Sequence, residues 1–342
     1  MQTAYGDISP RTAVHAARKF LEVGQPYVVW EYLAQSTPLP KNESDTVEWR
    51  EYEVLDPTPK TLGEGVTPSA TQLNHRDVTA TLTQYGDGIQ LSDQVEDFHE
   101  DPVLDIGIKR LGQQGAEMAE LIRTGSYEGG TNVWYANGTD RDDVNTTLTR
   151  DLQRKITRFL ERNRAKKISE VVKSEARYGT QNIPRAYFGV VHPDLDSVVR
   201  DMPGFKDVVD YGSISPFPNE IGSVEGVRYL KTDLINIWRD AGGDYDGSGT
   251  NMITESGTKA DVYPVYYVGA DALGTVALKG HEVKNNNGKM EPVVPVKIMV
   301  TNAKPSDSDP WAQRTWATYK FYLAAAILQD LWFVRAEVAV PE

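Results

Sequence analysis

Oxygen-bearing side chains between residues 244 and 255 form the pattern in the sequence that comes nearest to a metal site. Calcium-binding loops of twelve residues place oxygen ligands at positions 1, 3, 5 and 12 and a glycine at position 6. The corresponding residues here are Asp244, Asp246, Ser248, Glu255 and Gly249. Position 8 is usually apolar but is Asn251, and Gly257 and Pro264 oppose a helix after the loop. A flexible polar loop is therefore the first interpretation, and a calcium site is the alternative.

The sequence lacks the motifs of the common catalytic sites. Its histidines are scattered, at His15, His75, His99, His192 and His281. There is no His-Glu-x-x-His, Gly-x-Ser-x-Gly or phosphate-binding glycine loop. The chain has no cysteine, which excludes disulfides, thiolate metal sites and cysteine nucleophiles. We expect no enzymatic activity and no cofactor.

A basic segment lies between residues 149 and 167. Its eight basic and two acidic residues give a local charge of +6 and leave −19 for the rest of the chain. The candidate contact residues on its outer side are Arg154, Arg158 and Arg162. Such a run is usually a solvated face, but it also suits an acidic partner or a phosphate backbone.

Length and composition limit the classes of protein that remain. The chain has 342 residues and a net charge of −13. This negative charge argues against a protein whose whole surface binds nucleic acid or an anionic membrane. The N-terminus lacks a signal-peptide pattern, and no apolar run approaches 18 residues. We expect a soluble intracellular protein of one large domain or two to three smaller ones.

The clearest element is a helix over residues 101–124. An apolar stripe repeats at spacings of 4, 3, 4, 3 and 4, in the order Leu104, Ile108, Leu111, Gly115, Met118 and Ile122. Three glycines lie inside it, at Gly107, Gly112 and Gly115. Because glycine weakens a helix, these positions predict close approach of other elements.

Two strand patterns, over residues 46–55 and 77–85, predict a projecting hairpin. Charges interrupt both faces of the first strand, so we expect neither face to be buried in the chain's own core. In the second strand, Val78, Ala80 and Leu82 share one side. The 21-residue connection between them is rich in proline and glycine, and a connection of that length favours a functional loop over a compact turn. A disordered surface loop is the alternative.

Other elements are predicted with less detail. Ser9-Pro10 begins a helix with apolar residues at Ala13, Val14, Ala17, Phe20 and Leu21. A third helix spans residues 149–163, and a short helix spans 195–200. Strands are expected over 186–191, 262–268, 275–278, 293–301 and 332–340, with a tight reversal within 219–229. Residues 315–328 fit a helix and a strand equally well.

Taken in order along residues 20–339, these segments carry a resemblance to a known family. The matching stretches are Pro38-Leu39-Pro40-Lys41-Asn42, Thr46-Val47, Arg50-x-Tyr52, Leu62-Gly63-Glu64-Gly65-Val66-Thr67-Pro68, Val78-Thr79-Ala80-Thr81, Gln84-Tyr85-Gly86-Asp87, Asp101-Pro102-Val103-Leu104, Gly130-Thr131-Asn132-Val133, Val191-His192-Pro193-Asp194, Glu220-Ile221-Gly222, Gly226-Val227-Arg228-Tyr229, Ala324-Ala325, Ile327-Leu328 and Val334-Arg335-x-Glu337. They resemble the major capsid protein family of N4-like tailed phages, a branch of the HK97-like capsid fold. Residues 240–258 and 285–287 have no counterpart in this resemblance.

The resemblance implies an α+β chain with the HK97-like phage capsid fold. Residues 1–44 would form an N-terminal arm, 45–97 an extended loop, and 98–148 a peripheral domain with a long spine helix. An axial domain would occupy 149–278, and strands in 279–342 would return to the peripheral domain.

The implied function is self-assembly into the icosahedral head shell of a tailed bacteriophage, around its double-stranded DNA genome. The implied partners are further copies in hexamers and pentamers, a separate scaffolding protein, a portal protein and cement proteins. No membrane is involved, and assembly would take place in the host bacterial cytoplasm before the protein becomes part of the virion. The alternatives are an encapsulin-like compartment shell and, as a different class, a calcium-dependent binding protein or hydrolase.

Two sets of contact residues follow from the projecting hairpin and the basic helix. On the hairpin, Trp49 and Tyr52 would supply apolar contacts with a neighbouring subunit, and Arg50 and Arg76 would supply ion pairs. On the basic helix, Arg154, Arg158 and Arg162 would face packaged DNA or another partner.

Because only 37 residues precede Pro38, we also expect a separate scaffold and no N-terminal processing.

Overall fold

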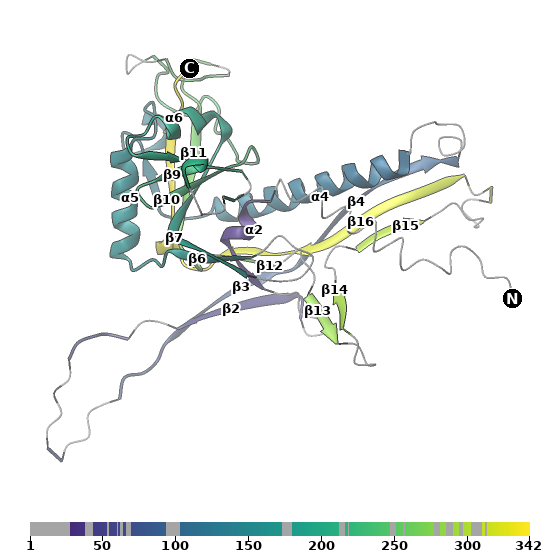
Figure 1. Cartoon of the computed structure of the whole chain (residues 1–342), viewed down its shortest axis with the longest axis horizontal. Coiled ribbons are helices and arrows are strands. Elements are labelled where there is room, and N and C mark those ends of the chain that lie inside the picture. Colours follow the sequence, from purple (N-terminus) through teal and green to yellow (C-terminus); the bar gives the residue numbers. More distant parts are fainter. Residues whose placement is uncertain are drawn as a thin grey trace.

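The computed structural model describes residues 28–37, 44–52, 55–59, 61, 64–65, 70–93, 103–172, 180–211, 216–217, 219–246, 251–255, 257–276, 281–284, 290–293, 297–301, 310–311 and 313–342. Three parts are visible: a sheet domain, a long helix that extends from it beside a narrow sheet, and a hairpin that projects away from both (Figure 1). The helix expected over residues 10–21 and the linker at 38–42 lie outside the described residues.

The sheet domain is built on eight strands. Along the sheet these are β5 (Val133–Tyr135), β18 (Phe333–Ala339), β11 (Val262–Val268), β7 (Thr180–Val191), β10 (Val227–Lys231), β9 (Glu220–Val224) and β8 (Phe205–Asp207), with β6 (Ile168–Val172) paired to β7. β10 runs parallel to β7, and β11 is antiparallel to both β7 and β18. The sheet is therefore mixed, as expected for an α+β chain.

The central strands carry apolar residues on both sides because both faces of the sheet are covered. On one face, Tyr263, Val265 and Tyr267 of β11 pack with α5 (Arg150–Arg162) and α6 (Asp196–Arg200). On the other face, Tyr266 and Val268 pack with α2 (Trp30–Leu33). The buried-type strands predicted from continuous apolar runs are confirmed.

The long helix is α4 (Val103–Tyr127), close to the predicted 101–124. It covers one face of a three-stranded antiparallel sheet formed by β15 (Lys297–Thr301), β16 (Arg314–Leu323) and β4 (Thr83–Ser92). Along β16, Thr315, Ala317, Tyr319, Phe321 and Leu323 are buried in alternation, and this period of two settles the ambiguous segment as a strand.

The predicted close approach of another element to the helix is confirmed at Gly107. A Cβ atom built on Gly107 would lie 2.2 Å from Cδ1 of Ile89 in β4, so the absence of a side chain lets Ile89 pack directly against the helix there. Gly112 and Gly115 are buried.

The hairpin consists of β2 (Thr46–Tyr52) and β3 (His75–Thr81), paired antiparallel from Thr46 opposite Thr81 to Tyr52 opposite His75. Its base lies next to a small sheet of β1 (Gln35–Thr37), β12 (Leu273–Val276) and β17 (Ala325–Ile327). The remaining elements are β13 (His281–Lys284), β14 (Met290–Val293) and the short 3-10 helices Arg141–Asp143, Pro193–Leu195, Val208–Tyr211 and Asp330–Trp332.

The strands after residue 279 are divided between two parts of the structure. Residues 279–342 were expected to return as a unit to the part that contains the long helix, and β15 and β16 do so. β18 instead lies between β11 and β5 in the sheet domain. The cause is its two-sided burial, because Phe333 packs on one face of the sheet and Val334, Ala336 and Val338 pack on the other.

Candidate functional site

The base of the hairpin is held within the chain. Val47 and Trp49 are buried against Val276, Ala324 and Leu328. The indole Nε1 of Trp49 also donates a hydrogen bond to Oγ1 of Thr37, at 2.8 Å. The expectation that neither face of this strand is buried is therefore wrong, because the small sheet supplies an apolar surface far away in sequence. Trp49 thus anchors the hairpin within its own chain, and a contact of Trp49 with another subunit stays a prediction.

Both arginines of the hairpin have partners within the chain. Arg50 donates two hydrogen bonds to Asp77, at 2.8 and 3.0 Å, and one to Glu48. The hydrogen bond and charge of Asp77 raise the pKa of Arg50. Arg76 pairs with Glu51 at 3.5 Å and donates to the backbone oxygen of Leu328. Half of each arginine side chain is exposed, so a further contact with another subunit stays a prediction.

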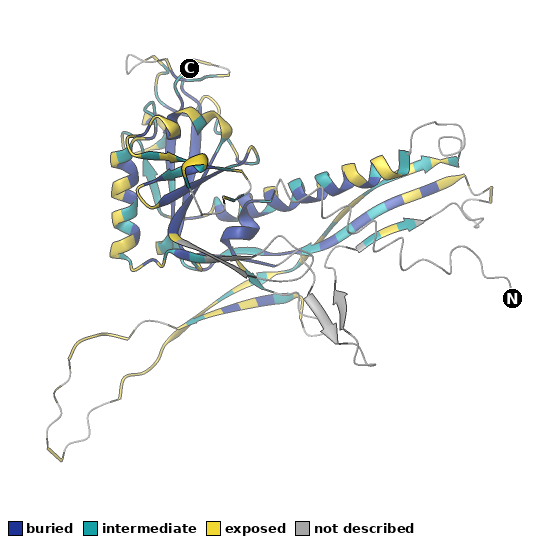
Figure 2. Cartoon of the chain, in the orientation of Figure 1, coloured by how far each residue is buried: buried dark blue, intermediate teal, exposed yellow. Residues whose placement is uncertain are grey.

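The outer half of the hairpin exposes large apolar side chains. Tyr52 is 58 % exposed, Leu55 51 % and Leu73 52 %. Figure 2 shows this part of the chain as exposed, beyond the alternating buried positions of β2. Sequence reasoning selected Tyr52 but missed Leu55 and Leu73. The available signal was their position, since they are apolar residues on either side of the proline-rich connection.

The basic helix forms as predicted, with a partly neutralised outer side. Thr149 caps α5 by accepting a hydrogen bond from the backbone nitrogen of Leu152. Arg154 binds both carboxylate oxygens of Glu225, at 2.5 and 2.7 Å. Within the described part of the chain, Arg158 and Arg162 are exposed and form no ion pair. The positive face is therefore centred on these two residues.

The proposed calcium loop is not seen as a set of converging ligands. Residues 247–250 lie outside the described residues, and they include Ser248 and Gly249 of the calcium pattern. The carboxylate of Glu255 is 2.6 Å from Nη1 of Arg239. Among the residues that the structure describes, no three His, Asp or Glu side chains gather in a group that would hold a metal ion.

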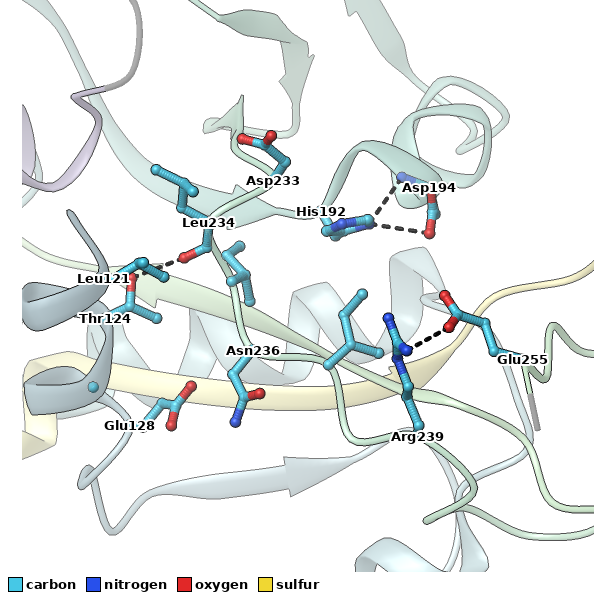
Figure 3. Close-up of a pocket in the computed structure, with 13 residues that line it drawn as sticks. Leu121, Thr124, Glu128, His192, Asp194, Asp233, Leu234, Asn236, Arg239 and Glu255 are labelled. Carbon is cyan, nitrogen blue, oxygen red and sulfur yellow. Dashed lines mark hydrogen bonds and ion pairs between the residues drawn. The ribbon is translucent and has the colours of Figure 1, made fainter. Parts of the chain in front are cut away.

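An open cleft of about 700 Å³ lies where α4 meets the sheet domain. It is lined by Leu121 and Thr124 of α4 and by Glu128 directly after it, by His192 and Asp194, and by Asp233 and other residues of the following loop (Figure 3). Nδ1 of His192 is 3.1 Å from Asp194, and burial lowers the pKa of His192 despite the attraction of that carboxylate. A neutral imidazole is therefore expected near pH 7.

The lining residues do not form a nucleophile and base pair. Thr124 of α4 brings a hydroxyl group to the cleft, but this hydroxyl donates to the backbone oxygens of Glu120 and Leu234 and lies across the cleft from His192 (Figure 3). No helix in the described ranges is long and apolar enough to cross a membrane.

Comparison of the sequence with protein-family models and with curated proteins finds no match. Comparison of the structure finds similar chains in phage capsids. The capsid of Ralstonia phage GP4 matches with a TM-score of 0.64 at 12 % identity, over 91 % of this chain and 88 % of the other. The head of Helicobacter pylori bacteriophage KHP40 gives 0.57 at 10 % identity, over 93 % and 91 %. The capsid of cyanophage Pam1 gives 0.56 at 12 % identity, over 93 % and 92 %.

The chain has the fold of phage capsid proteins. The α+β, HK97-like architecture predicted from the sequence agrees with these structures. The sequence resemblance expects α4 as the spine helix, the sheet domain as the axial domain, and β2 with β3 as the extended loop, and these assignments stay a prediction. The match extends over most of both chains.

Proposed function

We propose that the chain is the major capsid protein of a tailed bacteriophage of the N4-like branch, and that it self-assembles into an icosahedral shell around double-stranded DNA. The observation that carries the proposal is the shared fold over about nine tenths of the chain and of capsid chains. The sequence stretches that resemble the N4-like family support the finer assignment. The protein would then reside in the virion after assembly in the host cytoplasm, with no enzymatic role.

The extended loop supports assembly because its base and its outer half have different surroundings. The base is fixed by Val47 and Trp49, so the direction in which the loop projects is set by the subunit itself. The outer half presents Tyr52, Leu55 and Leu73 to solvent. Covering each of these half-exposed side chains in another subunit would contribute about 1 kcal/mol. Repeated around a closed shell, such contacts stabilise the particle.

The proposed partners differ in how they would bind. Other copies of the chain would cover the extended loop, and a separate scaffolding protein, a portal protein and cement proteins would join during or after assembly. The strongly acidic chain as a whole would avoid tight adhesion to DNA, while the face around Arg158 and Arg162 would provide a local contact.

Expression of the full chain in a bacterial host tests the proposal. We expect closed shells by electron microscopy and a particle mass of many subunits by light scattering, with or without a co-expressed scaffold. A monomer or small oligomer under all conditions would argue against a shell protein. Shells that enclose a specific protein instead of DNA during phage infection would favour an encapsulin-like compartment.

Charge reversal on the basic helix tests its partner. The double variant Arg158→Glu, Arg162→Glu leaves the Arg154–Glu225 pair intact. If this face binds DNA, we expect packaged particles to lose DNA more readily at low salt, with a difference that shrinks as salt rises because phosphate contacts release counterions. The matched control is Lys109→Glu with Lys206→Glu, at two exposed positions elsewhere. A failure of empty shells to form would indicate an acidic neighbouring subunit, and unchanged assembly and DNA retention would indicate a solvated face.

A further inference from the structure

β4 is an edge strand of the narrow sheet beside α4. In this sheet β16 lies between β15 and β4, so β4 has a strand on one side only among the residues that the structure describes. Figure 1 shows β4 and β15 on the two sides of β16. An edge strand presents a row of backbone N–H and C=O groups that can pair with a further strand.

The hydrogen bonds at the two ends of β4 show which of its residues face the open side. At one end, the backbone nitrogen of Asp93 donates to the oxygen of Gln313 at 3.1 Å, so the odd-numbered residues of β4 bond to β16. At the other end, the nitrogen of the even-numbered Leu82 donates instead to Asp45, directly before β2, at 2.7 Å. The residues of β4 whose backbone groups face the open side are therefore Gln84, Gly86, Gly88, Gln90 and Ser92.

The side chains of these five residues lie on the face of the sheet that points away from α4. The odd-numbered Tyr85 and Ile89 pack with α4, and successive side chains of a strand alternate between the two faces. Four of the five residues on the outer face are exposed, and Gly88 is partly exposed. None of them carries a charge and two are glycines, so a second strand can approach this side without burying an ionised group.

β4 lacks the features by which edge strands avoid pairing, which are shortness, charges and proline. The outermost strands of the eight-stranded sheet, β5 and β8, have three residues each. β15 has five residues and begins with Lys297. β4 has ten residues, no proline and a single charged residue, Asp87, which accepts a hydrogen bond from Gln114 of α4 at 2.6 Å. A long edge of this composition suits a strand that is covered in an assembly.

We propose that β4 pairs antiparallel with β4 of a second copy of the chain, about a two-fold axis at Gly88. The proposal rests on the proposed self-assembly, because the partner is another subunit. Gly88 is the midpoint of the open edge from Gln84 to Ser92. This register sets Gln84 opposite Ser92 of the partner subunit, and Gly86 opposite Gln90 of the partner subunit. A two-fold axis brings identical residues together, so an edge without charges on its open side avoids like-charge pairs.

The neighbouring strands leave room for this pairing at both ends of β4. β3 and β4 are separated by Leu82 alone, and β2 lies along β3 and reaches Leu82 through Asp45. The open side of β4 therefore begins where β2 ends. In the proposed register, β2 of the second copy comes to lie beyond Ser92, where β4 itself has ended. The two copies of β4 thus fill the space between the two hairpins.

Disulfide trapping tests the register, because the chain has no native cysteine. Full-length Gln84→Cys and Ser92→Cys subunits are assembled together and oxidised, and electron microscopy of the same sample shows whether shells form. We expect a crosslinked dimer to form at least roughly tenfold faster in the mixture than in either variant alone. Opposite residues in the mixture have Cα atoms about 5.5 Å apart, within disulfide range, whereas two copies of one cysteine lie about 26 Å apart along the strands.

The two readouts separate the strand pairing from the proposed function. Shells that form without the mixed crosslink would overturn the pairing and leave the shell function standing. A mixed crosslink in a protein that forms no shells would support the pairing and contradict the shell function. Absence of both would overturn both.

Proline at position 90 gives an independent test. The N–H of Gln90 faces the open side, so Gln90→Pro removes a donor from the proposed pairing but none from the bonds to β16. We expect wild-type circular dichroism and a concentration for assembly that rises at least roughly tenfold, measured by light scattering. Gln90→Thr keeps the N–H and is the matched control, expected to assemble as the wild type does. A folded Gln90→Pro subunit that assembles at the wild-type concentration would contradict the pairing.

Discussion

Deletion of residues 58–69, with the ends joined by glycines, is expected to leave a folded subunit that cannot close shells. The described residues inside this segment, such as Thr61 and Glu64, are exposed, while the base of the hairpin is held by Val47 and Trp49. The far-UV circular dichroism and the melting temperature should therefore stay close to those of the wild type. Electron microscopy and light scattering should show no closed particles, because a two-stranded ribbon requires further contacts for stable order and here would find them in another subunit.

Two variants separate the loop's assembly role from its anchoring role. Leu55→Ser with Leu73→Ser keeps the length of the loop but removes about 2 kcal/mol of apolar burial per subunit contact, and should raise the concentration needed for assembly by roughly 30-fold. Trp49→Ala should instead destabilise the subunit by about 3 kcal/mol or more.

Two outcomes of the 58–69 deletion would contradict the proposed assembly role. Unfolding of the subunit by the 58–69 deletion would place that segment in the core. Normal shell yield would show that it is no assembly element.

Elements that depend on local burial were predictable from the sequence. The spacing of apolar residues predicted α4 and α5, close to the bounds that the structure shows. The reversal expected within 219–229 is also present, with Glu225 and Gly226 both at positive φ between β9 and β10. These features arise from interactions among residues a few positions apart, so the signal is contained in a short window.

Features that depend on distant partners were not predictable. Charges around Trp49 suggested an unburied strand, because nothing near it in the sequence reveals that β12 and β17 supply its apolar neighbours. The exposed Leu55 and Leu73 were overlooked for the same reason, since exposure is a property of the assembled fold. Arg123 and Glu120 lie outside the apolar stripe predicted for the helix, yet both are fully buried.

The buried charges of α4 lie where α4 meets α2 and the small sheet. Nη1 of Arg123 is 2.8 Å from Oε1 of Glu120, and Nη2 is 3.6 Å from Glu31 of α2. Nε of Arg123 donates to Oγ1 of Thr275 in β12. Burial raises the pKa of Glu120 against the attraction of Arg123. Although burial opposes its charge, the carboxylates of Glu31 and Glu120 raise the pKa of Arg123.

Arg123→Met is therefore expected to destabilise the subunit by about 3–5 kcal/mol, measured by urea unfolding of the unassembled protein. The variant leaves two carboxylates in a dry site without their cation, while Met fills most of the arginine's volume. The loss should be smaller in a Glu31→Gln background, because only one buried carboxylate then remains unpaired. A double-mutant cycle of these substitutions measures the difference, which we expect to exceed 1 kcal/mol.

The pH dependence of the same variant distinguishes unpaired charge from lost packing. Without Arg123, the pKa of Glu120 in the folded subunit rises further above its value in the unfolded chain. Between these two pKa values the folded state binds more protons than the unfolded state, so stability falls as pH rises. Arg123→Met should thus be nearer to the wild type at pH 5 than at pH 8, whereas a packing defect such as Trp49→Ala should cost the same at both. A pH-independent loss in Arg123→Met would show that Glu120 is already neutral in the folded protein, and that Arg123 acts there through its packing and its hydrogen bond to Thr275.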